Sequence, residues 1–486
     1  MMPPPDPMPQ TLNRAAGAPH CSGLGIGGFS GVCHAGDLIP TALGYHGVMV
    51  ALAFDTDRAL LDVQWLVEKI GPRVHQSEAE ADAVRGVVER LREAGWAVRL
   101  RGGSPVACRG DAGTLLLAHL DTVEGSPGAV DNAAAVAVLL ELARTSQAPD
   151  LCLGFPVGEE HGLRGSRMLA AQWAAGPLNL VVSLDLIGRG RPTAIDLDRS
   201  WGTDEIRWLH ERSEIDTPLL HRIVGRAAPQ WRSDHGPFAA RGTLAFQIMT
   251  RGPEAVFTRY HQTTDDRVYP DAMLATAEAL EGLATGGTPP RSSGDPAIAI
   301  GRFVVSGTTV WSVIGLGVLS GLPGLPRLRQ SIPDLARLGV MVLVAAVFML
   351  VPLVAGFPVT EAEATVANVI GHAETGWWAA TPWAVAAAWA GWLVLWRSLP
   401  GTGHPALMAA LISVPLSVVD PLLALPFAVA AVGVRVHPLL GLAPAVLVIR
   451  PTTLQEFAFW GLLSPWCWPL LFMLTFTAIG RIHNPR

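Results

Sequence analysis

Long apolar runs in the carboxyl-terminal half of the chain restrict its fold more than any other feature. Residues 303–480 consist mostly of Trp, Leu, Val and Ala, whereas the preceding part mixes charged and apolar residues. A helix of ~20 apolar residues is long enough to cross a bilayer. We therefore expect an all-α transmembrane domain of about six helices, with spans at 303–322, 338–357 and 376–396, two or three shorter ones within 405–449, and a last one at 456–479.

The composition divides the chain into four regions. Residues 58–283 have the mixture of a soluble α/β domain, and the Pro-, Gly- and Ser-rich residues 284–302 form an expected linker to the transmembrane domain at 303–480. Residues 1–57 form the N-terminal region: the first 36 residues lack periodicity, and the weakly apolar segment 38–54 is a marginal anchor or export segment.

Charge and cysteine spacing argue against two classes of protein. The net charge is -6 without a cluster of Lys or Arg, which argues against nucleic acid as a partner. The cysteines are scattered and form no Cys-x-x-Cys pair, so their spacing predicts isolated thiols instead of a disulfide framework or a thiolate zinc site. They are Cys21, Cys33, Cys108, Cys152 and Cys467.

The soluble region alternates helical patterns with short apolar runs. Ser77 and Glu80 form a capping-box pattern ahead of apolar residues at helical spacing, which predicts an amphipathic helix up to Gly95. Short apolar runs separated by helix-like segments are typical of a mixed, largely parallel sheet with helices on both faces. The runs lie at 114–123, 151–157, 180–188 and 244–249.

Polar residues stand where these predicted strands end, and ligands collect at the carboxyl ends of parallel strands. Each has an ordinary explanation alone; Asp131, for example, immediately precedes a helix and suits an N-cap. Together they form a set of imidazoles and carboxylates without thiolates, the donors of a catalytic zinc site. The proposed ligands are His119, Asp131, Glu160, Asp185 and His261. Five ligands with one bridging carboxylate hold two ions, and adjacent Glu159 is left free to act as the general base.

Six motifs in this region resemble those of the di-zinc aminopeptidase family, which includes the leucyl aminopeptidases and aminopeptidase Y. In chain order they read HLD, GAVDNAAA, GEEHGLRGS, LDLIG, SDHGPF and YHQTTDD, within residues 58–283. The multi-span carboxyl half resembles the layout of the membrane-bound branch, typified by endoplasmic-reticulum metallopeptidase and vacuolar membrane protease. The resemblance implies a zinc peptidase-like fold and a zinc-dependent aminopeptidase with two zinc ions, acting on peptides.

The resemblance also implies a role for individual residues. His119 and Asp185 bind one zinc, Glu160 and His261 bind the other, and Asp131 bridges the two. Glu159 is the general base, Asp121 orients the metal-bound imidazole, and Tyr260 donates a hydrogen bond to the oxyanion of the reaction. Asp234 and His235 shape the pocket. Gln262 departs from the family, which usually has Thr after the histidine.

Basic residues between the predicted spans indicate an orientation in the membrane. Arg327, Arg329 and Arg337 follow the first span and Arg397 follows the third, whereas the loop 358–375 contains no Lys or Arg. By the positive-inside rule, the basic loops are cytoplasmic and the peptidase domain is extracytoplasmic. The bilayer is then a partner of this multi-pass membrane protein, in addition to its peptide substrates.

Two other functions remain open at this point. One is a glutaminyl-cyclase-like zinc acyltransferase, which uses a similar frame with a single zinc. The other is a membrane transporter or scaffold whose peptidase-like domain is not catalytic. The sequence indicates neither the preferred amino-terminal residue of a substrate nor the oligomeric state.

Overall fold

The computed structural model describes most of the soluble region and the linker, and parts of the apolar carboxyl half. The described residues are 53–111, 113–227, 229, 231–251, 260–291, 294–300, 303–327, 329, single positions between 407 and 418, and 421–436. All of them belong to the second of the two units into which the chain divides, Gly47–Arg486. The predicted spans at 338–357, 376–396 and 456–479 lie outside the described residues, as does all but the end of the segment 38–54.

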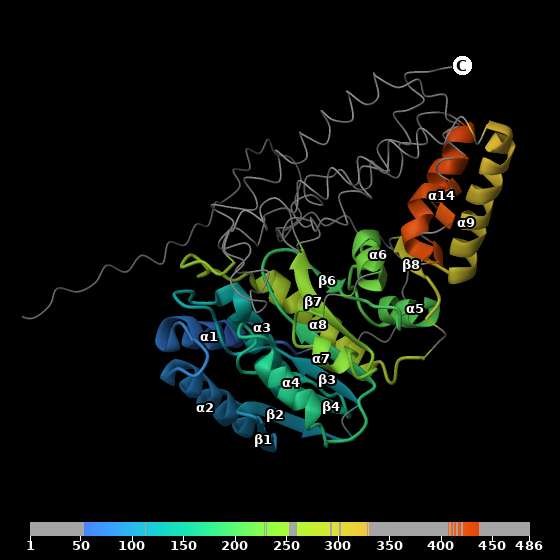
Figure 1. The fold of residues 1–486 in the computed structure, drawn as a ribbon. Helices are drawn as coiled ribbons and strands as arrows, with labels where there is room; N and C mark the ends of the chain where they lie inside the picture. The colour runs from blue at the N-terminus through green and yellow to red at the C-terminus, as the bar shows by residue number, and fades with distance from the viewer. Residues whose placement is uncertain are drawn as a thin grey trace, which may run out of the picture. The chain divides into compact units, whose positions relative to one another are not determined.

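A seven-stranded mixed sheet forms the centre of the domain (Figure 1). Its order is β1-β2-β4-β3-β5-β7-β6, and the four inner strands β4, β3, β5 and β7 are parallel. These four coincide with the apolar runs, so the predicted largely parallel sheet is confirmed. The antiparallel outer strands β1, β2 and β6 were not predicted. The bounds are β1 Val98–Arg101, β2 Ser104–Arg109, β3 Thr114–Leu117, β4 Leu151–Gly154, β5 Leu180–Leu184, β6 Arg191–Ile195 and β7 Ala245–Arg251.

Helices cover both faces of this sheet, as predicted. Successive side chains of a strand point to opposite faces, and in β3 Leu116 belongs to one buried cluster and Leu115 and Leu117 to the other. The first cluster includes buried residues of five helices: α1 Thr56–Gln64, α2 Glu78–Glu93, α3 Ala134–Thr145, α5 Thr203–Arg212 and α8 Pro270–Thr285. The second takes in α4 Arg164–Ala171 and α7 Gly236–Ala239.

Helix α2 begins where the sequence predicts, with a variation in its cap. The Ser77 hydroxyl accepts a hydrogen bond from the amide N–H of Glu80 at 3.1 Å. The Glu80 carboxylate accepts from the amide of Gln76 at 2.7 Å, one residue before the position that a reciprocal capping box uses. The helix is therefore confirmed, and Glu80 stabilises the turn that precedes it.

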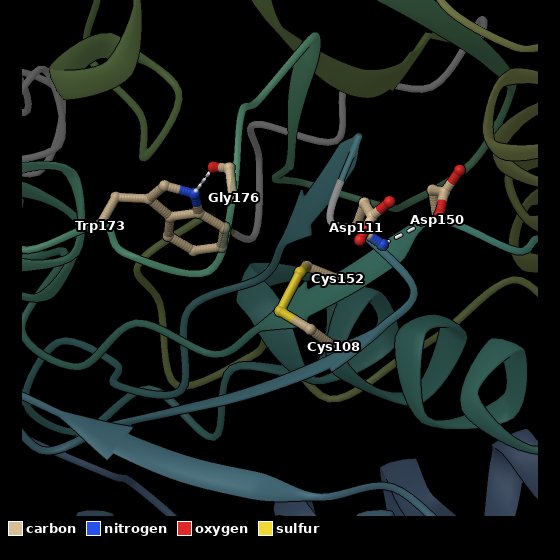
Figure 2. The surroundings of a disulfide bond; sticks show 6 residues. All are labelled: Cys108, Asp111, Asp150, Cys152, Trp173 and Gly176. Atoms are coloured by element: carbon tan, nitrogen blue, oxygen red, sulfur yellow. Dashed lines mark hydrogen bonds between the residues drawn. A yellow bond between two sulfur atoms is a disulfide. The ribbon is translucent and has the colours of Figure 1, made fainter.

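The structure corrects the prediction that all cysteines are isolated. Cys108 on β2 and Cys152 on β4 form a disulfide (Figure 2). The two residues are direct partners in the antiparallel register, although 44 positions separate them in the sequence. Strand pairing brings them together, and cysteine spacing carries no information about that pairing. Nearby, the amide of Asp111 donates to the Asp150 carboxylate at 2.9 Å (Figure 2).

The apolar carboxyl half begins with a hairpin, an α-helix and a short 3-10 helix. A hairpin of β8 Ile298–Ile300 and β9 Phe303–Val305 leads into α9 Gly307–Gly321, which continues as the 3-10 helix η4 Leu322–Arg327. Within the described residues, one helix, Gly307–Pro326, is long and apolar enough to cross a membrane. The predicted span at 303–322 therefore begins with a strand, and the multi-span domain stays a prediction.

Helix α9 packs against α14 Pro421–Val436, and both contact the α/β domain. A Cβ atom at Gly317 would lie 2.5 Å from the Cα atom of Ala428, so the absence of a side chain allows the two helices to approach closely. Their shared cluster includes Ile314 and Leu425, and Leu219 and Ile223 of α6 Leu219–Ala227 pack against it.

Candidate metal centre

The predicted site residues meet beyond the carboxyl ends of the parallel strands. His119 follows β3, Asp185 follows β5, and the turn after β4 carries Glu159 and Glu160. The other two come from loops: Asp131, whose φ of -119° and ψ of 83° are not helical, lies in the segment η2 Ala129–Ala133 ahead of α3, and His261 lies ahead of α8.

Two groups of donor atoms share Asp131. One group is His119, Asp131 and Asp185, and the other is Asp131, Glu160 and His261; within each, the donor atoms lie within 4.8 Å of one another. Nε2 of His119 lies 3.2 Å from Oδ1 of Asp131, and Nε2 of His261 lies 3.0 Å from Oδ2. The two oxygens of one carboxylate thus face two different imidazoles.

The donor atoms have the character of a cation site. Within the described residues, Oδ1 of Asp131, Oε1 of Glu160 and Nε2 of His261 are buried without a hydrogen-bond partner. Buried polar atoms are rarely left unpaired unless an ion, a water or a catalytic role accounts for them. Imidazoles and carboxylates without thiolates suit a catalytic zinc site, so these residues fit a bound divalent cation.

The orientation of His119 follows from its main-chain contact. Nδ1 of His119 lies 3.1 Å from the carbonyl oxygen of Asp121. A carbonyl oxygen only accepts, so Nδ1 carries the proton of this hydrogen bond and the lone pair of Nε2 faces Asp131. The Asp121 carboxylate lies farther from Nδ1, at 3.7 Å. Asp121 therefore orients the imidazole as expected, but mainly with its main-chain carbonyl and not with its carboxylate.

The Asp121 carboxylate instead holds the turn that carries the paired glutamates. It accepts the amide N–H of Glu159 at 2.9 Å and that of Glu160 at 3.0 Å. Gly158 has a φ of 68° and Leu163 a φ of 59°, so the chain turns sharply at both ends of this segment. Adjacent side chains point apart on a strand, but in this turn both carboxylates lie within 4.8 Å of the His119 donor atom and of each other.

Asp131 does not cap α3, because within the described residues its carboxylate forms no hydrogen bond with an amide of that helix, and Ala133 directly precedes the helix. The amides of Val130 and Asp131 donate to the two carboxylate oxygens of Asp265, at 2.9 and 3.1 Å. Asp265 is fully buried. The YHQTTDD stretch predicted roles for Tyr260 and His261 and a departure at Gln262, but not that its first acidic residue, Asp265, supports the bridging carboxylate.

Two further polar residues support the centre and were not predicted. Nε2 of Gln247 on β7 donates to Oδ2 of Asp185 at 3.2 Å. Nδ2 of Asn132 donates to the carbonyl of Leu184 at 2.8 Å. The first contact joins β7 to the ligand that follows β5, and the second joins the Asp131 loop to the end of β5. Sequence spacing does not reveal contacts between segments so far apart in the chain.

Tyr260 contacts a proposed ligand, and His235 contacts β5. The Tyr260 ring stacks on His261, with 3.7 Å between centroids, and burial together with Glu160 and Asp131 raises the pKa of its phenol well above the usual value. Nδ1 of His235 lies 3.2 Å from the Ser183 hydroxyl. The side chain of Gln262, the departure from the family pattern, is exposed.

Carboxylates and imidazoles shift one another's ionisation strongly. Burial raises the pKa of Glu159 well above its usual value, and burial with Asp131 raises that of Glu160 to about 7. Burial alone would lower the pKa of His261, but Glu160 and Asp131 raise it to about 10. The raised pKa favours a proton on His261, which a bound cation would displace.

The nearby Asp234 is a buried carboxyl group whose pKa burial raises to about 7. Its Oδ1 atom has no hydrogen-bond partner among the described residues. Asp234 and His235 belong to the SDHGPF motif, and both are buried. Neither belongs to the donor groups described above.

The domain is similar to a known peptidase family. Residues 97–281, less than half of the chain, match the profile of Peptidase family M28. No curated protein matches the chain. The family match supports the peptidase resemblance and places the ligand-bearing segments inside a peptidase-like region.

Several solved structures show a distant likeness. A zinc aminopeptidase from Bacillus subtilis is 14% identical, with 48% of this chain and 94% of that chain covered and a TM-score of 0.40. The LapA aminopeptidase of Legionella pneumophila is 17% identical, with 49% and 73% covered and a TM-score of 0.41. A glutaminyl cyclase from Porphyromonas gingivalis is 19% identical, with 47% and 96% covered and a TM-score of 0.39. Likenesses at this level do not indicate which reaction this chain performs.

Proposed function

We propose that the protein is a membrane-anchored, zinc-dependent aminopeptidase with two zinc ions. The observation that carries this proposal is the pair of donor groups that share Asp131. A single-zinc cyclase requires one such group, whereas two groups meeting at one carboxylate suit a bridged pair of ions. His119 and Asp185 would hold one zinc, and Glu160 and His261 the other.

The catalytic roles follow from where the remaining groups lie. Zinc in such a site supplies a Lewis acid that polarises the scissile carbonyl and makes water more acidic. The Glu159 carboxylate lies within 4.8 Å of the His119 and Glu160 donor atoms but belongs to neither group that shares Asp131. It takes the proton of the attacking water and delivers it to the departing amine. The Tyr260 phenol, kept neutral by its raised pKa, donates a hydrogen bond to the developing oxyanion.

An extracytoplasmic position of the peptidase domain is part of this proposal. The disulfide between Cys108 and Cys152 supports it, because disulfides persist in oxidising compartments and are rare in the reducing cytosol. The helix Gly307–Pro326 follows the β8–β9 hairpin and supplies one candidate anchor. The substrates would then be peptides that reach the outer face of the membrane.

The test is to incubate the full-length protein, purified in detergent, with a mixture of unblocked peptides. We expect free amino acids to be released stepwise from the amino termini, release to stop with a zinc chelator, and added zinc to restore it. Acetylated peptides of the same sequences serve as a matched control and should not be cleaved. Loss of ammonia from peptides that begin with Gln, without release of amino acids, would support the cyclase instead.

A further inference from the structure

Arg73 is a deeply buried cation beside the candidate metal centre. Only 1% of its surface is exposed, and its guanidinium donates to main-chain carbonyls. Within the described residues it forms no ion pair with a carboxylate. Its acceptors are the carbonyls of Leu66, Gly71, Leu120, Pro127 and Gly128, at 2.8 to 3.2 Å. Arg73 also precedes the segment that matches the peptidase family.

The carbonyls of Leu120, Pro127 and Gly128 belong to the segments that carry metal donors. Leu120 lies between His119 and Asp121, and Gly128 lies three residues before Asp131. The Arg73 amide donates to the Thr122 hydroxyl at 2.9 Å, and the Thr122 amide donates to the Arg73 carbonyl at 3.1 Å. One side chain thus fixes the distance between the end of β3 and the loop of the bridging carboxylate.

Asp265 holds the same loop from another side. Its carboxylate binds the amides of Val130 and Asp131, and its carbonyl accepts the Ala129 amide at 3.0 Å. Gly128 has a φ of 63°, and a Cβ atom there would lie 2.8 Å from Nη2 of Arg73. The loop is therefore held by a cation at its carbonyls and by an anion at its amides, with no space for a larger residue at Gly128.

We infer that Arg73 and Asp265 are positioning residues that form a clamp on the Asp131 loop and set the affinity of the centre for zinc. This inference rests on the proposed function. The clamp directs one oxygen of Asp131 toward His119 and the other toward His261, 3.2 and 3.0 Å away. The guanidinium of Arg73 spreads its N–H donors over a planar fork that reaches carbonyls on several segments, whereas the fewer donors of a Lys ammonium radiate from one nitrogen atom.

Arg222 provides a matched comparison for Arg73. It is also fully buried, and its guanidinium donates to the carbonyls of Leu197, Trp201 and Ala297. None of these acceptors is next to a proposed zinc ligand in the sequence. If a buried Arg only stabilises the fold, replacing either residue should have the same effect on zinc binding, namely none.

The experiment compares wild type, Arg73→Lys, Asp265→Asn and Arg222→Lys as full-length protein in detergent. Zinc affinity is measured by competition with a chromophoric chelator, and thermal unfolding is measured in excess chelator. We expect both Lys variants to have a lower Tm without metal. Only Arg73→Lys and Asp265→Asn should bind zinc more weakly, by about 10-fold to 100-fold, as for residues that orient metal ligands.

Unchanged zinc affinity in Arg73→Lys and Asp265→Asn would overturn the clamp, and so would an equal weakening in Arg222→Lys. If Arg73→Lys fails to fold, Asp265→Asn decides alone. A wild-type protein that binds no zinc would overturn the proposed function itself. The titration distinguishes this result from failure of the clamp alone, in which wild type and both variants bind zinc equally well.

Discussion

The Asp121 carboxylate accepts the amide N–H of Glu159 at 2.9 Å, so a residue at the end of β3 determines where the proposed base lies after β4. The same carboxylate binds the amide of Glu160. Asp121 is fully buried and has no side-chain contact with the zinc donors closer than its 3.7 Å approach to His119. Its effect on the reaction should therefore come through the geometry of the glutamate turn.

Asp121→Asn should bind zinc and yet turn over more slowly, because an amide group cannot accept both N–H bonds. We expect kcat to fall by about 10-fold to 100-fold, with KM nearly unchanged. Steady-state kinetics with a dipeptide and elemental analysis check this. Asp150→Asn is the control, because Asp150 accepts the Asp111 amide in the same way away from the site. Equal rates in Asp121→Asn and wild type would contradict the account.

Glu159→Gln should retain zinc and the fold but lose turnover. Gln has almost the same shape, but it cannot accept the proton of the attacking water, and general-base catalysis contributes about 10²-fold to 10⁴-fold. Single-turnover kinetics at saturating peptide measures the loss. Glu281→Gln changes another buried glutamate, on α8, and should leave the rate unchanged. A nearly normal rate in Glu159→Gln would assign the proton to another group.

His235 should make the fold less stable in acid. Burial lowers its pKa to about 3, so the folded state keeps the imidazole neutral, while the unfolded chain takes up a proton near the ordinary pKa of ~6.5. Protonation of His235 in the unfolded chain does not lower the free energy of unfolding above the unfolded pKa. As the pH falls below that pKa, the unfolded chain binds the proton and the free energy of unfolding decreases. Between pH 7 and pH 5 the loss is about 2 kcal/mol.

The measurement is the Tm of wild type and His235→Gln across this range, in excess chelator. The wild-type Tm should fall more steeply toward pH 5 than that of His235→Gln, whose side chain does not titrate. Parallel curves would show that His235 does not contribute to the acid sensitivity.

Removing the disulfide should destabilise the domain without changing the zinc content. Cys108 and Cys152 close a loop of about 44 residues, for which the usual stabilisation is about 2–4 kcal/mol. Cys108→Ser should therefore unfold at a lower temperature than Cys467→Ser, its control. Thiol labelling under denaturing, non-reducing conditions should find Cys108 and Cys152 blocked in wild type. Full labelling of both would contradict the pairing and remove its support for an oxidising compartment.

The sequence predicted the parts of the fold that depend on local pattern. The inner strands are continuous apolar runs, and the site residues directly follow them, so both could be located without a structure. Strands β1, β2 and β6 are short and less apolar, as in "VRLR" of β1 and "RPTAI" of β6, and only their pairing with neighbours makes them strands.

The supporting contacts could not be predicted, because they join distant segments. Asp265 acts on amides 135 and 134 positions away, and Arg73 reaches a carbonyl 55 positions away. In the sequence, Arg73 is one basic residue among many in a polar stretch. Its burial depends on contacts with the loop that carries Asp131, and these contacts can be identified only in the folded structure.

The shared use of Asp131 is the central claim, and zinc stoichiometry tests it most directly. Elemental analysis of the full-length protein, dialysed after zinc loading, should give about two zinc ions per chain for wild type and about one for His119→Ala, which loses one donor group. Asp131→Ala should lose both ions, because both groups depend on its carboxylate. A wild type with a single zinc, or an Asp131→Ala variant that keeps two, would contradict the bridged centre.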